Sequence, residues 1–521
     1  MKTITGKALL ALLKTDRVVV AVIPLFLLWL QSLFLDARTP FYINNQDPAY
    51  LYLSSFVTLG EFNFTDFVDH PALIWQLVGA VICRIAHAIW SGGLPYAESL
   101  IAYPEHYLLV VSWCLQVMFV YLVYQIGIAL QQLLCDLSKT ILCQLVLLFS
   151  STFTIYRSVG VSAEVMVMIV SFSVIWLCIR YLSADSVKRA CLSWGIWFGL
   201  GGALILGTKL TAVPLLAFVF LVPENWKQRW IAAGVTVFGF GIQWLVAIPS
   251  LDYFTDFVGR IFFKGGEYGG GSSGFDVSQM GENFLRILKS DPLMVFFLFL
   301  SLFIALPSIR TNGIVKNRIL SVRLWDRLVL SCFIAFAGHW LIVAKQFRQH
   351  YLLGATPLYV LLVIFFYCGL VPGDKKKLKQ WAGFVLSACI ITLGGMGAFR
   401  VLNSSHSDGD KALQKLAQST KYAELPLYSV ENSITYGNAF AYFGVFNKSE
   451  RYERFIRKHW TEVYAEGEIE FSEMISRLER SDYQGFLLIS KKARDAKVAG
   501  FDSLLIKESN TYQLRKYVKI K

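Results

Sequence analysis

Charged residues are scarce in this sequence. They make up 16% of the 521 residues, whereas a soluble globular chain carries roughly 25%. Hydrophobic residues make up 55% of the chain, and the mean hydropathy is +0.51. So few polar side chains cannot cover the surface of a chain this long. The composition therefore argues against an ordinary soluble protein and favours one that lies in a lipid bilayer.

Paired cysteines are also missing. The nine cysteines are scattered singly, without a Cys-x-x-Cys motif, and none follows Cys389. A zinc site or a disulfide framework needs cysteines at paired spacings, so neither is expected. The net charge is +13, but much of the basic excess falls in short loops between apolar runs. Because nucleic-acid binding needs a clustered basic face, this distribution argues against a nucleic-acid partner.

Long apolar runs dominate the chain instead. A membrane-spanning helix needs about 20 apolar residues, and helices satisfy every backbone polar group within the segment. The first run is long and lacks a small-residue cleavage site, so we interpret it as a span rather than a signal peptide. We predict eleven spans, at residues 17–35, 107–132, 139–156, 163–182, 190–206, 209–222, 230–249, 292–308, 327–344, 351–371 and 381–401.

The segment Pro71–Trp90 decides the predicted orientation. It is apolar, but it contains Arg84 and His87, so we interpret it as a helix lying on the membrane surface. The N-terminus and the basic clusters at residues 188–189, 227–229, 310–323 and 375–379 then fall on the cytoplasmic side, as the positive-inside tendency requires. If Pro71–Trp90 were a span, these clusters would lie outside.

This orientation predicts two domains. Residues 1–401 form a polytopic all-α membrane domain with outer loops at 36–106 and 250–292. Residues 402–521 are polar and begin with a serine-rich linker, so we expect a small extracytoplasmic α/β domain. Its expected helices lie at 410–422 and 471–482, and its expected strands at 425–430, 486–489, 503–506 and 512–518.

Polar and charged residues gather near the predicted outer ends of the spans. Such residues are costly in a membrane unless they are paired or hydrated, so each is a functional candidate. Asp47 stands before Pro48, where it can also serve as the N-cap of a helix, and the two roles are compatible. Glu164 can instead be one half of an ion pair with Arg157. Some of the lysines and arginines near the ends of the spans can instead have no functional role, with side chains that extend along apolar surface to the membrane interface.

Five segments, in this order along the chain, resemble motifs of the C-type glycosyltransferase superfamily. The resemblance is greatest to its branch of protein O-mannosyltransferases and aminoarabinose transferases. It covers roughly residues 1–400 and, more loosely, the C-terminal tail. The matching segments read QDPAYLYLSS, DHPALIWQLVGAV, YRSVGVSAEVMVMIV, GLGGALILGTKLTAVPLLAF and KQFRQHYLLGATPL.

The resemblance implies an enzyme that takes a sugar from a polyprenyl-phosphate donor at the outer leaflet. The acceptor would be a glycan, a lipid or a protein. By carry-over from the motifs, Asp47 is the general base and Glu164 assists it. The implied donor-phosphate residues are Lys209, Arg348, Arg157, Lys264 and His350, and the implied acceptor or surface-helix residues are Tyr50, Asp69 and His70.

The sequence departs from the family pattern at two positions. Pro48 stands where many members have Glu, and Ala72 stands where a second Pro is common. The first departure removes a carboxylate, so the use of Mg²⁺ or Mn²⁺ stays open, with Asp47 and Glu164 as the ligands if a metal is bound. We expect a bacterial inner membrane protein with a cytoplasmic N-terminus and a periplasmic or extracellular C-terminal domain, since Lys519–Lys521 carry no retention signal.

Two other functions stay open. A transporter or flippase typically has charges at the membrane midplane, broken helices and repeated halves. This chain has its charges near the outer edge and no repeat, but His339 and Trp340 fall inside a predicted span. The other alternative is a non-catalytic, sugar-binding scaffold of the same fold. Loss of activity on substitution of Asp47 would separate an enzyme from a scaffold.

Overall fold

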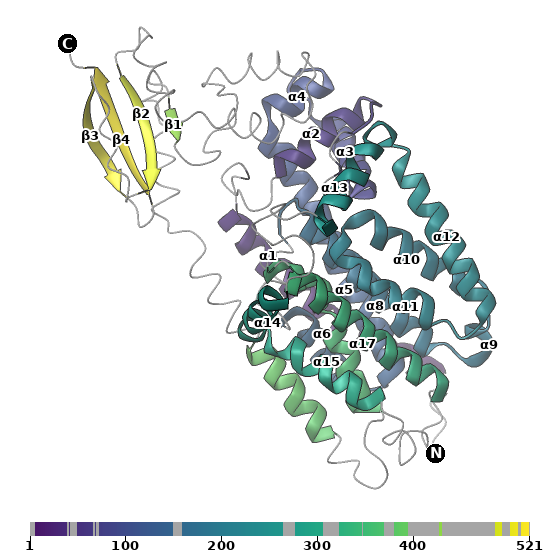
Figure 1. Ribbon diagram of the computed structural model, residues 1–521. Coiled ribbons are helices and arrows are strands. Elements are labelled where there is room, and N and C mark those ends of the chain that lie inside the picture. Colours follow the sequence, from purple (N-terminus) through teal and green to yellow (C-terminus); the bar gives the residue numbers. More distant parts are fainter. Residues whose placement is uncertain are drawn as a thin grey trace.

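A computed structural model gives the structure of the protein (Figure 1). It describes residues 6–38, 41, 49–65, 68, 72–149, 159–263, 277–305, 322–345, 347, 349–368, 380–393, 427–429, 485–491, 501–508 and 512–519. Described residues up to 393 are mainly helical, and those from 427 onward are strands.

Helices of very different length make up the first part of the chain. The first half contains α1 (Gly6–Arg38), α2 (Ala49–Gly60), α3 (Leu73–Ile89), α4 (Tyr96–Ala102), α5 (Pro104–Leu134), α6 (Leu137–Phe149), α8 (Ala163–Ser183), α9 (Ser186–Arg189) and α10 (Ser193–Thr208). The second half contains the 3-10 helix η2 (Leu210–Leu215), α11 (Leu216–Leu221), α12 (Trp226–Trp244), η3 (Ile248–Ser250), α13 (Leu251–Phe263), α14 (Val277–Ser290), α15 (Pro292–Ala305), α17 (Val322–Lys345), η4 (Gln349–Gly354), α18 (Leu358–Cys368) and a helix at Gln380–Leu393.

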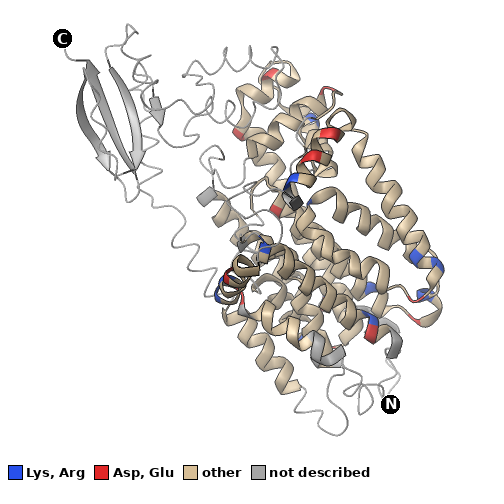
Figure 2. Ribbon diagram, viewed as in Figure 1, with Lys and Arg blue, Asp and Glu red and all other residues tan. Residues whose placement is uncertain are grey.

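Among the described residues, four helical segments are long and apolar enough to cross a membrane. They are Asp16–Leu35, Pro104–Leu134, Ala163–Ser183 and Leu324–Lys345. A fifth candidate is the pair Trp226–Trp244 and Ile248–Arg260, which is bent by 97°. Shorter apolar helices coincide with most of the other predicted spans, and α10, α12, α15 and α17 carry few charges along most of their length (Figure 2). The chain is therefore a largely helical membrane protein, and the total of eleven crossings stays a prediction.

Helix α8 lies at the centre of the helical part. Of its most apolar stretch, 83% is buried, against 33% for the corresponding stretch of α1. Apolar side chains exposed on α1, such as Val18, Leu25 and Trp29, then suit a surface that faces lipid. Residues placed at the two ends of α8 are therefore held by the most buried of the four candidate spans among the described residues.

Helix α3 is the predicted surface helix. Its exposed side chains Leu77, Val81, Ile85 and Ile89 recur every four residues and form one apolar stripe. The opposite face is buried against α2 and α5. The prediction of a helix here is confirmed, although its start is wrong by two residues. Ala72 adopts a left-handed conformation with φ 34°, so the helix begins at Leu73 rather than at Pro71. Its position on the membrane surface stays a prediction.

Glycines allow α10 to pack closely against α12. Gly195 and Gly199 lie one helical turn apart and face α12. A Cβ at Gly195 would lie 2.6 Å from the carbonyl oxygen of Gln228, and one at Gly199 would lie 2.8 Å from that of Ala232. Small residues at such spacing let membrane helices approach until their backbones touch. The glycine-rich predicted span is thus explained by its packing.

Replacing Gly199 by alanine should therefore destabilise the protein. The added methyl group meets backbone that cannot move aside easily, and overpacking of this kind costs about 1–3 kcal/mol. Gly201→Ala is the matched control, because its Cβ would find no atom closer than 3.9 Å. Thermal unfolding in detergent should show a lower midpoint for Gly199→Ala only. Equal midpoints for the two variants would contradict this account of the α10–α12 contact.

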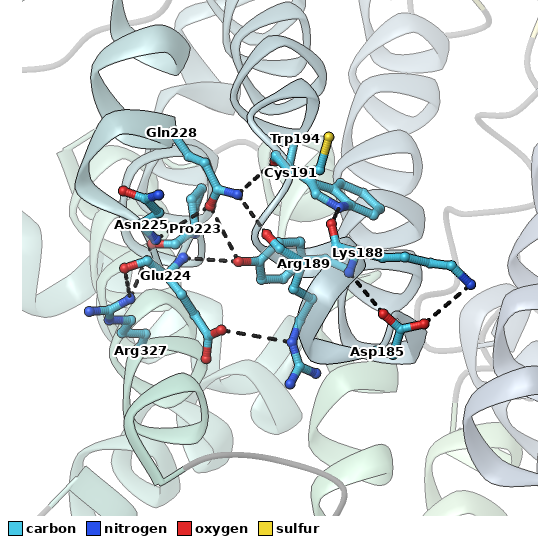
Figure 3. Close-up of polar contacts among 11 residues, drawn as sticks. Asp185, Lys188, Arg189, Cys191, Trp194, Pro223, Glu224, Asn225, Gln228 and Arg327 are labelled. Atoms are coloured by element: carbon cyan, nitrogen blue, oxygen red, sulfur yellow. Dashed lines mark hydrogen bonds and ion pairs between the residues drawn. The ribbon is translucent and has the colours of Figure 1, made fainter.

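A polar network joins three loops at one end of the helices (Figure 3). Gln228 Nε2 donates to the carbonyl oxygens of Arg189 at 2.6 Å and Cys191 at 2.8 Å. Arg327 Nη1 donates to the carbonyl oxygen of Glu224 at 2.9 Å, and the Glu224 carboxylate lies 3.7 Å from Arg189 Nε. These bonds tie the segment after α8 and the start of α12 to the first part of α17.

This network lies at the opposite end of α8 from Glu164. Glu164 is in the first turn of α8, whereas Arg189 follows its end, and a helix of 21 residues is about 30 Å long. The predicted separation of the basic loops from the outer polar residues is therefore confirmed for these two groups. Which end faces the cytoplasm stays a prediction.

The described C-terminal residues form one mixed sheet. Its strands are β1 (Leu427–Ser429), β2 (Gly485–Lys491), β3 (Phe501–Glu508) and β4 (Tyr512–Lys519), in the order β1-β2-β4-β3. Strand β1 pairs parallel to β2, and β4 pairs antiparallel to both β2 and β3. All four predicted strands are confirmed. The predicted helices at 410–422 and 471–482 lie outside the described residues, so the complete α/β domain stays a prediction.

Candidate active site

The first turn of α8 positions Glu164. The chain enters this helix through Gly160, whose φ of 110° favours glycine, and the Gly160 amide donates to Ser112 Oγ on α5 at 3.1 Å. Ser162 is extended and precedes the helix. The positive end of the helix dipole favours a carboxylate in this turn. Glu164 is therefore both anchored to α5 and stabilised as an anion, and it is only 3% exposed.

A break between two helices positions Lys209. Helix α10 ends at Thr208, Lys209 is extended, and η2 begins at Leu210. The Thr208 carbonyl accepts a hydrogen bond from the Ala72 amide at 3.1 Å, and Thr208 Oγ1 accepts one from Trp75 Nε1 at 3.0 Å. The break is therefore tied to the start of α3, which the sequence places directly after Asp69 and His70.

Lys209 and Glu164 meet in the interior. Lys209 Nζ donates to Glu164 Oε1 at 2.5 Å, and their side chains are only 7% and 4% exposed. His350 Nε2 lies 3.7 Å from the same oxygen. The Tyr351 ring centroid lies 5.0 Å from Lys209 Nζ and 4.7 Å from the His350 ring. Side chains from α8, from the α10–η2 break and from η4 thus converge at one point.

This arrangement places a cation in an apolar part of the protein. A buried charge costs several kcal/mol unless it is paired, and Glu164 supplies that pairing. The Tyr351 ring adds a cation–π contact. An ammonium group has three N–H donors, so the bond to Glu164 leaves Lys209 with capacity for another acceptor. Lys209 therefore has N–H donors left for an acceptor beside Glu164, in an apolar part of the helical bundle.

The structure describes four of the predicted site residues and brings three of them together. Glu164, Lys209 and His350 form the group above. Among the described residues, Lys209 is the cation nearest to Glu164. Arg157, the partner in the alternative ion pair, lies outside the described residues, so that alternative stays a prediction. The predicted residues that lie outside the described residues are Asp47, Asp69, His70, Arg157, Lys264 and Arg348.

Tyr50 has a partner that the sequence interpretation missed. Its hydroxyl donates to Glu105 Oε1 at 3.0 Å, and the Phe41 amide donates to Glu105 Oε2 at 2.8 Å. Phe41 and Tyr50 flank the segment that contains Asp47, so one carboxylate binds described residues on both sides of it. Glu105 follows Pro104 in the first turn of α5. Proline followed by an acidic residue is common at a helix start, so the sequence did not indicate a further role for Glu105.

Tyr351 is the other residue that was missed. It follows His350 within the segment KQFRQHYLLGATPL. Its position next to a predicted phosphate-binding residue was the signal that could have marked it as a site residue. Within the described part of the chain, no group of three or more His, Cys, Asp or Glu residues could hold a metal. A cation at Asp47 and Glu164 stays a prediction.

Comparison with protein-family models and with curated proteins found no match. Among solved structures, the chain is similar to ArnT from Cupriavidus metallidurans bound to undecaprenyl phosphate. That match covers 98% of each chain at 12% sequence identity, with a TM-score of 0.46. It is also similar to the apo state of the same protein, over 91% of this chain and 93% of that one, at 11% identity and a TM-score of 0.48.

Proposed function

We propose that this chain is a glycosyltransferase that moves a sugar from a polyprenyl-phosphate donor to an acceptor hydroxyl at the outer face of the membrane. The acceptor belongs to a glycan, a lipid or a protein. The observation that carries the proposal is the buried pair of Lys209 and Glu164, with His350 and Tyr351 beside it, in a bundle of apolar helices.

The position of this group suits an amphiphilic donor. A polyprenyl phosphate has an anionic headgroup and a long apolar chain, so its site needs a cation next to an apolar surface. Lys209 supplies the cation, and the helices around it supply the surface. A phosphate would share the Lys209 ammonium group with Glu164, through N–H donors that Glu164 does not use. Arg348, Arg157 and Lys264 are further proposed contacts for the phosphate.

The proposed reaction is a substitution at the anomeric carbon. The acceptor oxygen forms a bond to this carbon, and the bond from the carbon to the phosphate oxygen breaks with its electron pair left on the phosphate. Lys209 stabilises that growing negative charge, and preorganised groups of this kind usually supply a large part of catalysis. The acceptor proton passes to Asp47 as general base. Asp69, His70 and Tyr50 are proposed on the acceptor side.

Incubating the purified protein with a bacterial lipid extract tests this proposal. We expect polyprenyl-phosphate sugars in the extract to lose their sugar and free polyprenyl phosphate to accumulate, as measured by mass spectrometry. Undecaprenyl phosphate alone is the probe for binding, measured by native mass spectrometry. Intact donors after incubation would contradict the proposal. Movement of labelled lipid across proteoliposomes without loss of sugar would indicate a transporter, and binding without turnover would indicate a scaffold.

A further inference from the structure

His339 is a buried polar residue that the proposed reaction does not use. It lies on α17 and is completely buried. Its Nδ1 lies 2.7 Å from the carbonyl oxygen of Ala335, one turn earlier in the same helix. Because a carbonyl oxygen can only accept, Nδ1 carries the proton and Nε2 is left as an acceptor. Within the described residues Nε2 has no hydrogen-bond partner.

The unbonded edge of this ring lies against η4. A Cβ at Gly354 would lie 2.5 Å from His339 Nε2 and 3.3 Å from Cδ2, so only glycine fits there. Gly354 ends the 3-10 helix that carries His350 and Tyr351. The ring is therefore fixed on its own helix by the bond to Ala335, and it sets how closely η4 can approach α17.

The preceding residue of α17 makes the same kind of contact with η2. A Cβ at Gly338 would lie 2.8 Å from Pro214 Cβ and 2.9 Å from Pro214 Cγ. Pro214 belongs to the 3-10 helix that starts directly after Lys209. Two consecutive residues of α17 thus contact η2, which directly follows Lys209, and η4, which carries the aromatic ring of the candidate site.

We propose that Gly338 and His339 are positioning residues that set the separation between Lys209 and the His350–Tyr351 pair. Helix α17 acts as the common support for η2 and η4, so a shift of either short helix changes the distance between the groups they carry. This role gives a buried histidine within a predicted span a use other than transport, because the edge of its ring lies against Gly354. The inference rests on the proposed function only in the experiment that measures sugar transfer.

Reactivity of Lys209 tests the proposal without any need for activity. Full-length protein is treated with an amine-acylating reagent, and labelling of Lys209 is measured relative to the exposed Lys188 by peptide mass spectrometry. We expect Gly354→Ala and Gly338→Ala to increase labelling of Lys209. Each added methyl group shifts η2 or η4, and this opens the contact between Lys209 and Tyr351. His339→Asn, which keeps a donor for Ala335 but removes the ring edge, should do the same.

Gly127→Ala is the control for general destabilisation. A Cβ at Gly127 would clash with Gln144 Nε2 on α6 and would lie 2.6 Å from Val20 Cγ1 on α1, so this variant has a similar clash where α5 packs against α6 and α1. It should lower thermal stability and leave labelling of Lys209 at the wild-type level. Folded Gly354→Ala and Gly338→Ala proteins with wild-type labelling of Lys209 would overturn the proposal.

Transfer assays of the same variants test the link to function. Since a misplacement of about 1 Å can cost about 10²-fold, kcat/KM for the donor should fall about 10- to 100-fold in Gly354→Ala. Gly127→Ala should keep wild-type kcat/KM at a temperature where it is folded. A wild-type protein without transfer would refute the proposed function, and labelling would still decide whether α17 positions Lys209.

Discussion

Replacing Lys209 by methionine is expected to lower the free energy of unfolding by about 3–5 kcal/mol, because it leaves the Glu164 carboxylate buried without its lysine. The two side chains lie 2.5 Å apart and are almost fully buried, so solvent cannot replace the lost partner. The single variant therefore tests stability first. On its own it cannot show whether Lys209 also takes part in transfer.

The double variant Glu164→Gln with Lys209→Met separates stability from activity. It removes both charges and keeps side chains of similar size, and neutral replacements of buried ion pairs are often neutral or stabilising. We expect thermal unfolding close to that of the wild type. We also expect kcat/KM for the donor to fall by about 10²-fold or more, because the stabilising charge at the leaving phosphate is gone.

Lys188→Met is the matched control for loss of a lysine. Lys188 is 76% exposed, and its ion pair with Asp185 lies at the opposite end of α8, where exposed pairs contribute little to stability. This variant should keep both stability and transfer. A folded double variant with wild-type kcat/KM would remove Lys209 and Glu164 from the reaction and leave them a structural role only.

Asp47→Asn is expected to abolish transfer while the protein stays folded. A positioned general base contributes about 10²–10⁴-fold, and an asparagine cannot take up the acceptor proton. Asparagine and aspartate are about equally good N-caps, so the substitution keeps any capping role before α2. The measurement is kcat at saturating donor, together with thermal unfolding. The expected result is a loss of kcat of this size with an unchanged unfolding midpoint.

Two further variants sharpen the test of Asp47. Asp47→Ser also keeps an N-capping side chain and should be as inactive as Asp47→Asn. Asp185→Asn is the control for exchanging a capping aspartate, since the Asp185 side chain accepts from the Lys188 amide at the start of α9. It should leave transfer unchanged. Transfer near the wild-type rate in Asp47→Asn would assign Asp47 to capping alone.

Several features of the fold could be predicted from the sequence because they depend on local patterns of residues. Helices α5, α8 and α17 come from uninterrupted apolar runs long enough to cross a bilayer. The four strands near the C-terminus come from short apolar runs between polar segments. The polar residues near one set of helix ends were candidates because charge is costly there, and three of the four that the structure describes do meet.

Other features were not accessible, because they depend on contacts between distant segments. Glu105 reads as an ordinary residue of a helix start until Phe41 and Tyr50 are seen to bind it. The start of α3 was misplaced because the left-handed Ala72 is tied to Thr208, far away in the chain. The glycines of α10 were recognised as a motif, but the backbone they touch belongs to α12.

The amino-acid sequence by itself determined that this is a helical, apolar chain, where its long helices run and which residue types gather near their ends. Composition and periodicity decide these properties within a window of about 20 residues. Tertiary structure alone decided that Lys209 pairs with Glu164, 45 residues away, and that α17 supports both short helices beside them. Those contacts depend on how closely helices approach and where they break, and that is set by packing partners that no local pattern specifies.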